Sequence, residues 1–218
     1  GRHGDFSGRR VFVSAGGTRQ PIEPVRFISN RSTGKMGHRI AEAARDRGAD
    51  VLLITASDLP YPSGVEVVKA MTVEEMRDAI VPSSSEADLL IMAAAISDFT
   101  PAQVSDQKIK KQGQPETSLK LVEVEDFMPL AKGRKLVKVA FAAETNNVEE
   151  NAKAKTTPKG AAFVVANDIS EPGSGFGTDT NRVTFVDSQG NTQQHPLMTK
   201  LNVGHAILDY ALPLLTKH

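Results

Sequence analysis

Cysteine is absent from the 218-residue chain. Its absence excludes disulfides, thiolate nucleophiles and zinc sites built on thiolates. Net charge is also absent, because 26 basic residues balance 26 acidic ones, whereas proteins that bind duplex nucleic acid usually carry a basic excess. No apolar run approaches the roughly 18 residues that a membrane span needs. We therefore expect a globular protein in the cytoplasm, with no nucleic-acid or membrane partner.

Two kinds of catalytic motif are missing as well. No G-x-S-x-G elbow of a serine hydrolase occurs. The sequence identifies no metal ligands, since no two of its histidines have the spacing of a metal site: His3, His38, His195, His205 and His218.

The first ten residues contain no apolar core and do not resemble a signal peptide. We interpret residues 1–10 as a linker remnant from a larger protein. Residues 11–218 are then expected to form a single domain, in keeping with their length and with a hydrophobic content of 39%.

Short apolar runs alternate with segments of helical periodicity along most of the chain. Thr72 and Glu75 have the spacing of a capping box, and the apolar run at 89–95 is continuous, as in parallel sheets covered on both faces. The order predicts an α/β fold with a Rossmann-like, doubly wound, mostly parallel sheet. Strands are predicted at 11–15, 51–55, 65–68, 89–95, 136–141 and 161–166, an edge strand at 182–186, and helices at 36–47, 73–81, 148–155 and 201–215.

Residues 100–126 interrupt this alternation. Segments 108–112 and 118–124 alternate in polarity around a turn at 113–115, which predicts a β-hairpin arm inserted into the domain. The alternation would put Lys108 and Lys110 on one face. Such lysines form either a solvated edge or a lid that brings charge to a triphosphate.

The long connection after the first strand is the strongest local signal for a ligand. Gly34 and Gly37 flank a helix start, which indicates either an anion site or simply a turn and a cap. The segment is not a Walker A loop, because Ser29 and Met36 stand where that motif needs glycine and Ser or Thr. The second strand does not end in the acidic residue that binds the ribose hydroxyls of NAD, and Asp58 is a weak substitute for it. NAD binding is therefore disfavoured.

Several other polar or aromatic residues have two interpretations each. The planar guanidinium of Arg26 suits the binding of a phosphate or a carboxylate, and the Asn30 amide could donate to an oxyanion. Either side chain could instead form hydrogen bonds within its own loop. Asp98, at the end of the fourth strand, could bind a ligand or cap a turn. Phe141 could stack on a base or belong to the core.

Motifs along nearly the whole chain resemble those of phosphopantothenoylcysteine synthetases. The resemblance is closest to the bacterial form, in which this module is often the C-terminal half of a fusion with a flavin-dependent decarboxylase. The motifs are SAGGTR at 14–19, PVRFISNRSTGKMG at 24–37, AAAISDF at 93–99, KIKK at 108–111, FAAET at 141–145, VAND at 165–168 and GFGTDTN at 175–181.

This resemblance implies a ligase that joins 4′-phosphopantothenate to L-cysteine in coenzyme A biosynthesis. The reaction would pass through an acyl-cytidylate and release CMP and pyrophosphate. Bacterial members use CTP with Mg²⁺ and eukaryotic members use ATP. No FMN is expected, since the decarboxylase half is absent from this sequence, although a fused or upstream decarboxylase is implied as a partner.

The resemblance also implies roles for individual residues. Asn30 and Lys108 would be catalytic, and Arg26 would bind the pantothenate phosphate in the neighbouring subunit of a homodimer. Asn30, Ala94, Ala95 and Asp98 would also line the substrate pocket. The nucleotide would contact Gly16, Ser32, Gly34, Gly37, Asp98, Lys108, Asp126, Phe127, Phe141, Lys155, Lys159 and Asn167.

One segment departs from the family pattern. Members commonly have a Lys-Asn-Pro-Asp-like segment after the arm, whereas residues 123–127 read EVEDF and only Asp126 matches well. The base preference therefore stays open. Two alternatives also remain: an NAD(P)-binding Rossmann-like oxidoreductase or sugar-nucleotide enzyme, and a dimeric module without catalytic activity.

Overall fold

A computed structural model describes residues 3–111, 113, 116–144, 148–168 and 173–215. Residues 1–2 of the predicted linker, residue 112 of the predicted arm segment 108–112, residues 114–115 of the predicted turn and Thr145 of the FAAET motif lie outside the described residues. The strands are β1 Arg10–Ala15, β2 Gln20–Pro21, β3 Phe27–Ile28, β4 Asp50–Thr55, β5 Glu66–Lys69, β6 Leu89–Met92, β7 Phe99–Pro101, β8 Leu121–Glu123, β9 Val137–Glu144, β10 Phe163–Asp168, β11 Thr180–Asn181, β12 Val183–Asp187, β13 Thr192–Gln194 and β14 Met198–Thr199. The helices are α1 Lys35–Asp46, α2 Val73–Ile80, α3 Val148–Lys159 and α4 Lys200–Leu215, with short 3₁₀ turns η1 Ser84–Glu86 and η2 Met128–Leu130.

In the described part of the chain, eight strands form the main sheet in the order β13-β12-β10-β9-β6-β1-β4-β5. The strands from β5 to β10 run parallel, and β12 and β13 extend the sheet antiparallel. Numbered along the chain, the parallel strands have the order 3-2-1-4-5-6, which is that of the doubly wound dinucleotide-binding fold. The Rossmann-like fold class is therefore confirmed.

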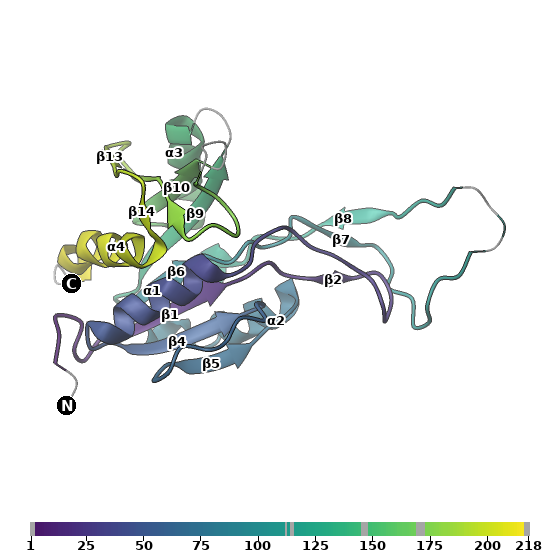
Figure 1. Cartoon of the computed structure of the whole chain (residues 1–218), viewed down its shortest axis with the longest axis horizontal. Coiled ribbons are helices and arrows are strands. Elements are labelled where there is room, and N and C mark those ends of the chain that lie inside the picture. Colours follow the sequence, from purple (N-terminus) through teal and green to yellow (C-terminus); the bar gives the residue numbers. More distant parts are fainter. Residues whose placement is uncertain (1–2, 112, 114–115, 145–147, 169–172, 216–218) are drawn as a thin grey trace.

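The two faces of the sheet bury separate apolar clusters. On β1, Val11 and Val13 pack with α1 and α4, whereas Phe12 points to the opposite face, which α2 covers. All three side chains are fully buried. Figure 1 shows α1 and α4 together on one side of the sheet and α2 on the other. Burial on both faces explains why these strands read as continuous apolar runs in the sequence.

Most predicted elements are confirmed, with changes in length. Helix α2 begins at the predicted capping box, in which Thr72 Oγ1 accepts from the Glu75 N–H at 3.1 Å. The fourth strand ends at Met92 rather than at Ala95. The prediction of an edge strand at 182–186 is wrong in one respect, because β13 pairs with the outer side of β12 and takes the edge position.

The predicted linker ends earlier than expected. Phe6 is fully buried and belongs to the cluster beneath α1 and α4. Its N–H donates to the Arg47 carbonyl at 3.0 Å, and the Arg47 guanidinium lies over its ring and pairs with Asp5. Residues from Asp5 onward are thus part of the packed structure, because an aromatic side chain at this position completes the core.

The inserted arm is present, but its strands differ from the predicted ones. Its base is formed by β7 and β8, which pair antiparallel, and the arm projects far beyond the sheet in Figure 1. Residues 108–111 form no strand, so the alternation does not place Lys108 and Lys110 on a sheet face. This segment instead contacts a short hairpin, β2–β3, that the sequence analysis did not predict.

Two side chains of the β2–β3 hairpin make this contact. The Ile109 N–H donates to Glu23 Oε2 at 2.9 Å, and Arg26 Nη2 donates to the Ile109 carbonyl at 2.8 Å. Arg26 Nε donates to Glu23 Oε1 at 3.0 Å, and this hydrogen bond holds the pKa of the Glu23 carboxyl below its usual range. Side chains therefore replace the strand partner that residues 108–111 lack.

None of the helices among the described residues is long and apolar enough to cross a membrane.

Candidate functional site

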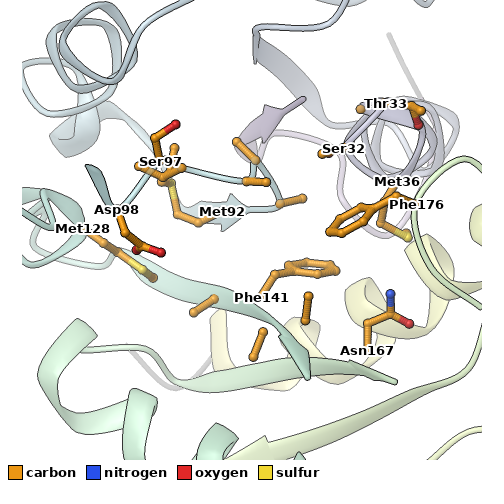
Figure 2. A pocket seen from close by; sticks show the side chains of 18 of the residues that line it. Ser32, Thr33, Met36, Met92, Ser97, Asp98, Met128, Phe141, Asn167 and Phe176 are labelled. Atoms are coloured by element: carbon orange, nitrogen blue, oxygen red, sulfur yellow. The ribbon is translucent and has the colours of Figure 1, made fainter. Parts of the chain in front are cut away.

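A cavity of about 390 Å³ opens at the carboxyl ends of β6, β9 and β10 and beside the start of α1, the helix that follows β1. This is the point at which the strand order reverses, where ligands bind in open α/β sheets. Figure 2 shows its lining, with Ser97, Asp98 and Met128 toward one end and Ser32, Thr33, Asn167 and Phe176 toward the other. The predicted site residues that line it are Ser32, Gly34, Ala94, Ala95, Asp98, Asp126, Phe141, Lys159 and Asn167.

One end of the cavity is formed by the start of helix α1. The helix begins after Gly34, which has a φ of 83° and provides no side-chain cap, so the first turn presents its N–H groups to the cavity end. Ser32 and Gly34 line the cavity at this point. A helix start of this kind attracts anions through its N–H groups and its dipole.

Gly16 and Gly37 do not line the cavity, and chain packing explains why both are glycine. A Cβ on Gly16 would lie 2.7 Å from the Ser57 nitrogen, and one on Gly37 would lie 2.5 Å from the Ala15 Cβ. These two glycines bring β1, α1 and the loop after β4 close together. They shape the helix-start end of the cavity through this packing, and their predicted contact with a nucleotide stays a prediction.

Asn30 lies between the two loops that meet at the cavity. Its Nδ2 donates to the Ala95 carbonyl at 2.8 Å, and its Oδ1 accepts from the Ser32 N–H at 2.9 Å. Gly17 has no room for a side chain because a Cβ would lie 2.3 Å from Asn30 Oδ1. Asn30 therefore fixes the positions of two cavity-lining residues, although its own side chain does not line the cavity in this structure.

Aromatic rings form the middle and one end of the cavity. Phe141, on β9, and Phe176, on the loop between β10 and β11, lie close to each other in Figure 2, with Asn167 beside them. Asn167 Oδ1 accepts from the buried Ser174 hydroxyl at 2.9 Å. This bond orients the Asn167 side chain, whose Nδ2 points toward the rings in Figure 2.

Carboxylates and a lysine form the opposite end. Asp98 is exposed at the cavity wall, where its carbonyl accepts from the Val124 N–H at 2.8 Å. Asp126 forms an ion pair with Lys159 and accepts from the Met128 N–H at 3.0 Å. The EVEDF segment at 123–127, which differs from the family pattern, therefore contributes Glu125 and Asp126 to the cavity wall.

Two lysines and one phenylalanine of the cavity were not among the residues predicted from the sequence. Lys35 and Lys200 are the first residues of α1 and α4, and both line the cavity together with Phe176. Lys200 is buried and donates to the Gly175 carbonyl at 3.0 Å, and burial lowers the pKa of its ammonium to about 8. The signal that could have found them is the GFGTDTN motif, which contains the partners of both lysines.

Some predicted residues lie away from the cavity. Arg26 and Lys108 belong to the hairpin and arm, and neither lines the cavity. Phe127 is 2% exposed and packs into the core cluster beneath α2, so its side chain does not face a ligand in the cavity. The Lys155 side chain lies outside the described residues. Asp58, the weak candidate for binding a ribose, forms ion pairs with Arg19 and Lys69 instead.

The described residues contain no group of three or more His, Asp or Glu side chains that could form a metal cage. The cavity does contain the carboxylates of Asp98, Glu125 and Asp126. Mg²⁺ is commonly held by one or two carboxylates together with substrate phosphates and water. This donor set fits Mg²⁺ that arrives with a polyphosphate, and it does not fit a resident metal held by protein ligands alone.

The fold and the cavity define a class of protein: a doubly wound α/β domain with a cavity at the topological switch point and a helix start of the kind that attracts anions. Residues 6–214 match the family described as the C-terminal domain of DNA/pantothenate metabolism flavoproteins. The chain belongs to this family.

Curated relatives and a solved structure agree with this assignment. The chain is 41% identical over 207 residues to the coenzyme A biosynthesis bifunctional protein CoaBC of Bacillus subtilis, covering 93% of this chain and 51% of the relative. It is 40% identical over 214 residues to a prokaryotic cysteine/cysteine sulfinic acid decarboxylase, covering 96% and 59%. The chain thus spans only about half to three fifths of these relatives. A crystal structure of the C-terminal domain of a CoaBC protein superposes with a TM-score of 0.82 at 32% identity, covering 98% and 99% of the two chains.

Proposed function

We propose that this domain is a phosphopantothenate–cysteine ligase, which joins 4′-phosphopantothenate to L-cysteine in coenzyme A biosynthesis. The observation that carries the proposal is the switch-point cavity, lined by the motifs of this ligase family, in a chain that belongs to the family. The decarboxylase name of one relative, of which the chain covers 59%, describes that whole protein and is not carried over to this domain.

The proposed reaction has two steps. The carboxylate of 4′-phosphopantothenate attacks the α-phosphate of CTP, which forms an acyl-cytidylate and releases pyrophosphate. The cysteine amine then attacks the acyl carbon, and CMP leaves as the amide forms. The carboxylate is already ionised at neutral pH, so the main obstacle in the first step is repulsion between negative charges.

The cavity supplies groups that reduce this repulsion. The first turn of α1, which begins after Gly34 and beside Ser32, would present fixed N–H donors to the phosphates, and such preorganised donors stabilise charge without reorganising. Asn30 is the neutral amide proposed to stabilise the reacting centre, and Lys108 would add positive charge if the arm closes. Mg²⁺, for which Asp98, Glu125 and Asp126 are the carboxylates in the cavity lining, would screen the phosphate charge.

We propose that the enzyme acts as a homodimer in the cytoplasm. Apolar side chains are exposed along the arm and the β2–β3 hairpin, including Val25 at 61%, Val104 at 53% and Ile109 at 47%. Exposed apolar surface of this kind marks an interaction site. Arg26 lies on the same projecting region and lines no part of its own chain's cavity, which supports the proposal that it binds the pantothenate phosphate in the other subunit.

The first experiment is a direct assay. The protein is incubated with 4′-phosphopantothenate, L-cysteine and Mg²⁺, with CTP or ATP in parallel, and pyrophosphate and 4′-phosphopantothenoylcysteine are measured. Product with CTP and little with ATP is expected. Product with ATP alone would retain the ligase and overturn the nucleotide assignment. No product with either nucleotide, from folded protein, would favour a non-catalytic module.

A further inference from the structure

A lysine that the proposed reaction has not used lies at the anion end of the cavity. Lys35 is the first residue of α1, beside Ser32 and Gly34. Its Nζ lies 2.9 Å from Asp179 Oδ1 and donates to the Gly177 carbonyl at 3.0 Å. The charge of Lys35 is therefore neutralised by the loop that contains Asp179, which lies 144 residues further along the chain.

This loop does not depend on Lys35 for its shape. The Gly175 N–H donates to Asn181 Oδ1 at 3.2 Å, and the Thr178 hydroxyl donates to the Thr180 carbonyl at 2.8 Å. Lys200 donates to the Gly175 carbonyl from beneath the loop. Because these bonds fix the loop independently, the Lys35 ammonium can leave Asp179 without loosening the cavity wall.

The Lys35–Asp179 pair is also easily broken. The Asp179 side chain is 85% exposed and that of Lys35 is 32% exposed, so water solvates both charges and salt screens their attraction. The Lys35 hydrogen bond holds the pKa of Asp179 below its usual range, which keeps the carboxylate ionised at neutral pH. A polyphosphate at the α1 start offers Lys35 more negative charge and more acceptor oxygens than one carboxylate does.

We propose that Lys35 is a further phosphate-binding residue of this cavity, and that Asp179 is the counter-ion it leaves when the polyphosphate of a nucleotide binds. The inference rests on the proposed function for its ligand, a nucleoside triphosphate. In the free protein Asp179 holds Lys35 at the cavity mouth and competes with the ligand for it. Removing the Asp179 charge should therefore strengthen nucleotide binding.

Calorimetric titration of the whole chain with CTP and Mg²⁺ at low salt tests this prediction. Asp179→Asn is expected to bind CTP about threefold more tightly, since a competing exposed ion pair is lost. Lys35→Gln is expected to bind about tenfold more weakly, because a charge-assisted phosphate contact is lost. Thermal unfolding of each variant checks that it remains folded.

A matched control separates this local competition from a general change in charge. Asp46 forms a similar exposed ion pair with Arg45 in the last turn of α1, with a side chain 51% exposed, and Asp46→Asn changes the net charge by the same amount. It should leave CTP affinity unchanged. In a Lys35→Gln background, Asp179→Asn should have no effect on CTP affinity, because the group it would release is gone.

The outcomes distinguish this inference from the ligase proposal. Unchanged or weaker CTP binding by Asp179→Asn, equal gains in Asp179→Asn and Asp46→Asn, or wild-type affinity in Lys35→Gln would overturn the role of Lys35 even if the enzyme makes product. The expected pattern of affinities without product would uphold Lys35 and remove the ligase. Failure of the wild-type protein to bind either CTP or ATP would overturn both.

Discussion

The sheet and the projecting arm use similar apolar residues in opposite ways. Val11 and Val13 in β1 are fully buried between two helical layers, whereas Val104 and Val122 in the arm region are 53% and 41% exposed. The core of the sheet is complete within one chain. The apolar surface of the arm has no such cover in the single chain, so we expect a second copy to provide it.

The first expected effect is on self-association. Val122→Asp places a charge on β8, where the dimer proposal would bury it, and burying an unpaired charge is costly. The variant is expected to raise the dimer dissociation constant at least about tenfold while its unfolding temperature changes little. Sedimentation velocity over a range of protein concentrations, with thermal unfolding in parallel, measures both quantities.

Phe163→Ala is the matched change in the sheet. Phe163 is fully buried, with its ring centroid 5.5 Å from that of Phe185 and 4.6 Å from that of Tyr210. Its removal should lower the free energy of unfolding by about 3–5 kcal/mol. If Val122→Asp lowered stability as much as Phe163→Ala, or left self-association intact, the contrast between the two regions would be wrong.

A smaller effect concerns Lys200, the charged group buried where α4 meets the cavity. Burial lowers its pKa to about 8 from an ordinary 10.5, so the unfolded chain binds this proton more tightly than the folded one. Stability should therefore rise with pH from about 8 to about 10.5, by on the order of 3 kcal/mol at most, and should not depend on this group below pH 8.

Urea unfolding of the wild-type protein and Lys200→Met across pH 7 to about 10.5 isolates this contribution, since other groups titrate in both proteins. The difference in unfolding free energy should move in favour of the wild type as the pH rises. A constant difference, or one that moves the other way, would contradict the burial of a charged ammonium at this position.

Local signals in the sequence were sufficient for much of the fold. The capping box at Thr72 and Glu75 depends on residues three apart, and the apolar run at 89–92 directly reflects burial on both faces of the sheet. The arm was less predictable. Alternation at 108–112 suggested a strand, but a strand also needs a partner, and this segment bonds to Glu23 and Arg26 instead.

The candidate site was predictable where motifs supplied it. The structure brings residues from five separated motifs to one cavity, among them Ser32, Asp98, Phe141, Asn167 and Phe176. The partners of Lys35 could not be predicted in this way. The pairing of Lys35 with Asp179 joins residues 144 positions apart and follows from the packing of α1 against α4.

Complementation between two inactive variants tests most directly the claim that two copies share each active site. Arg26→Ala and Asn30→Ala are each expected to lose most ligase activity. If Arg26 acts in the partner's cavity, a mixed dimer has one cavity with both defects and one with neither. Equimolar mixing with subunit exchange should then restore about a quarter of wild-type activity. Activity of the mixture no higher than the average of the two variants would show that both residues serve the same chain's cavity, and would contradict the account.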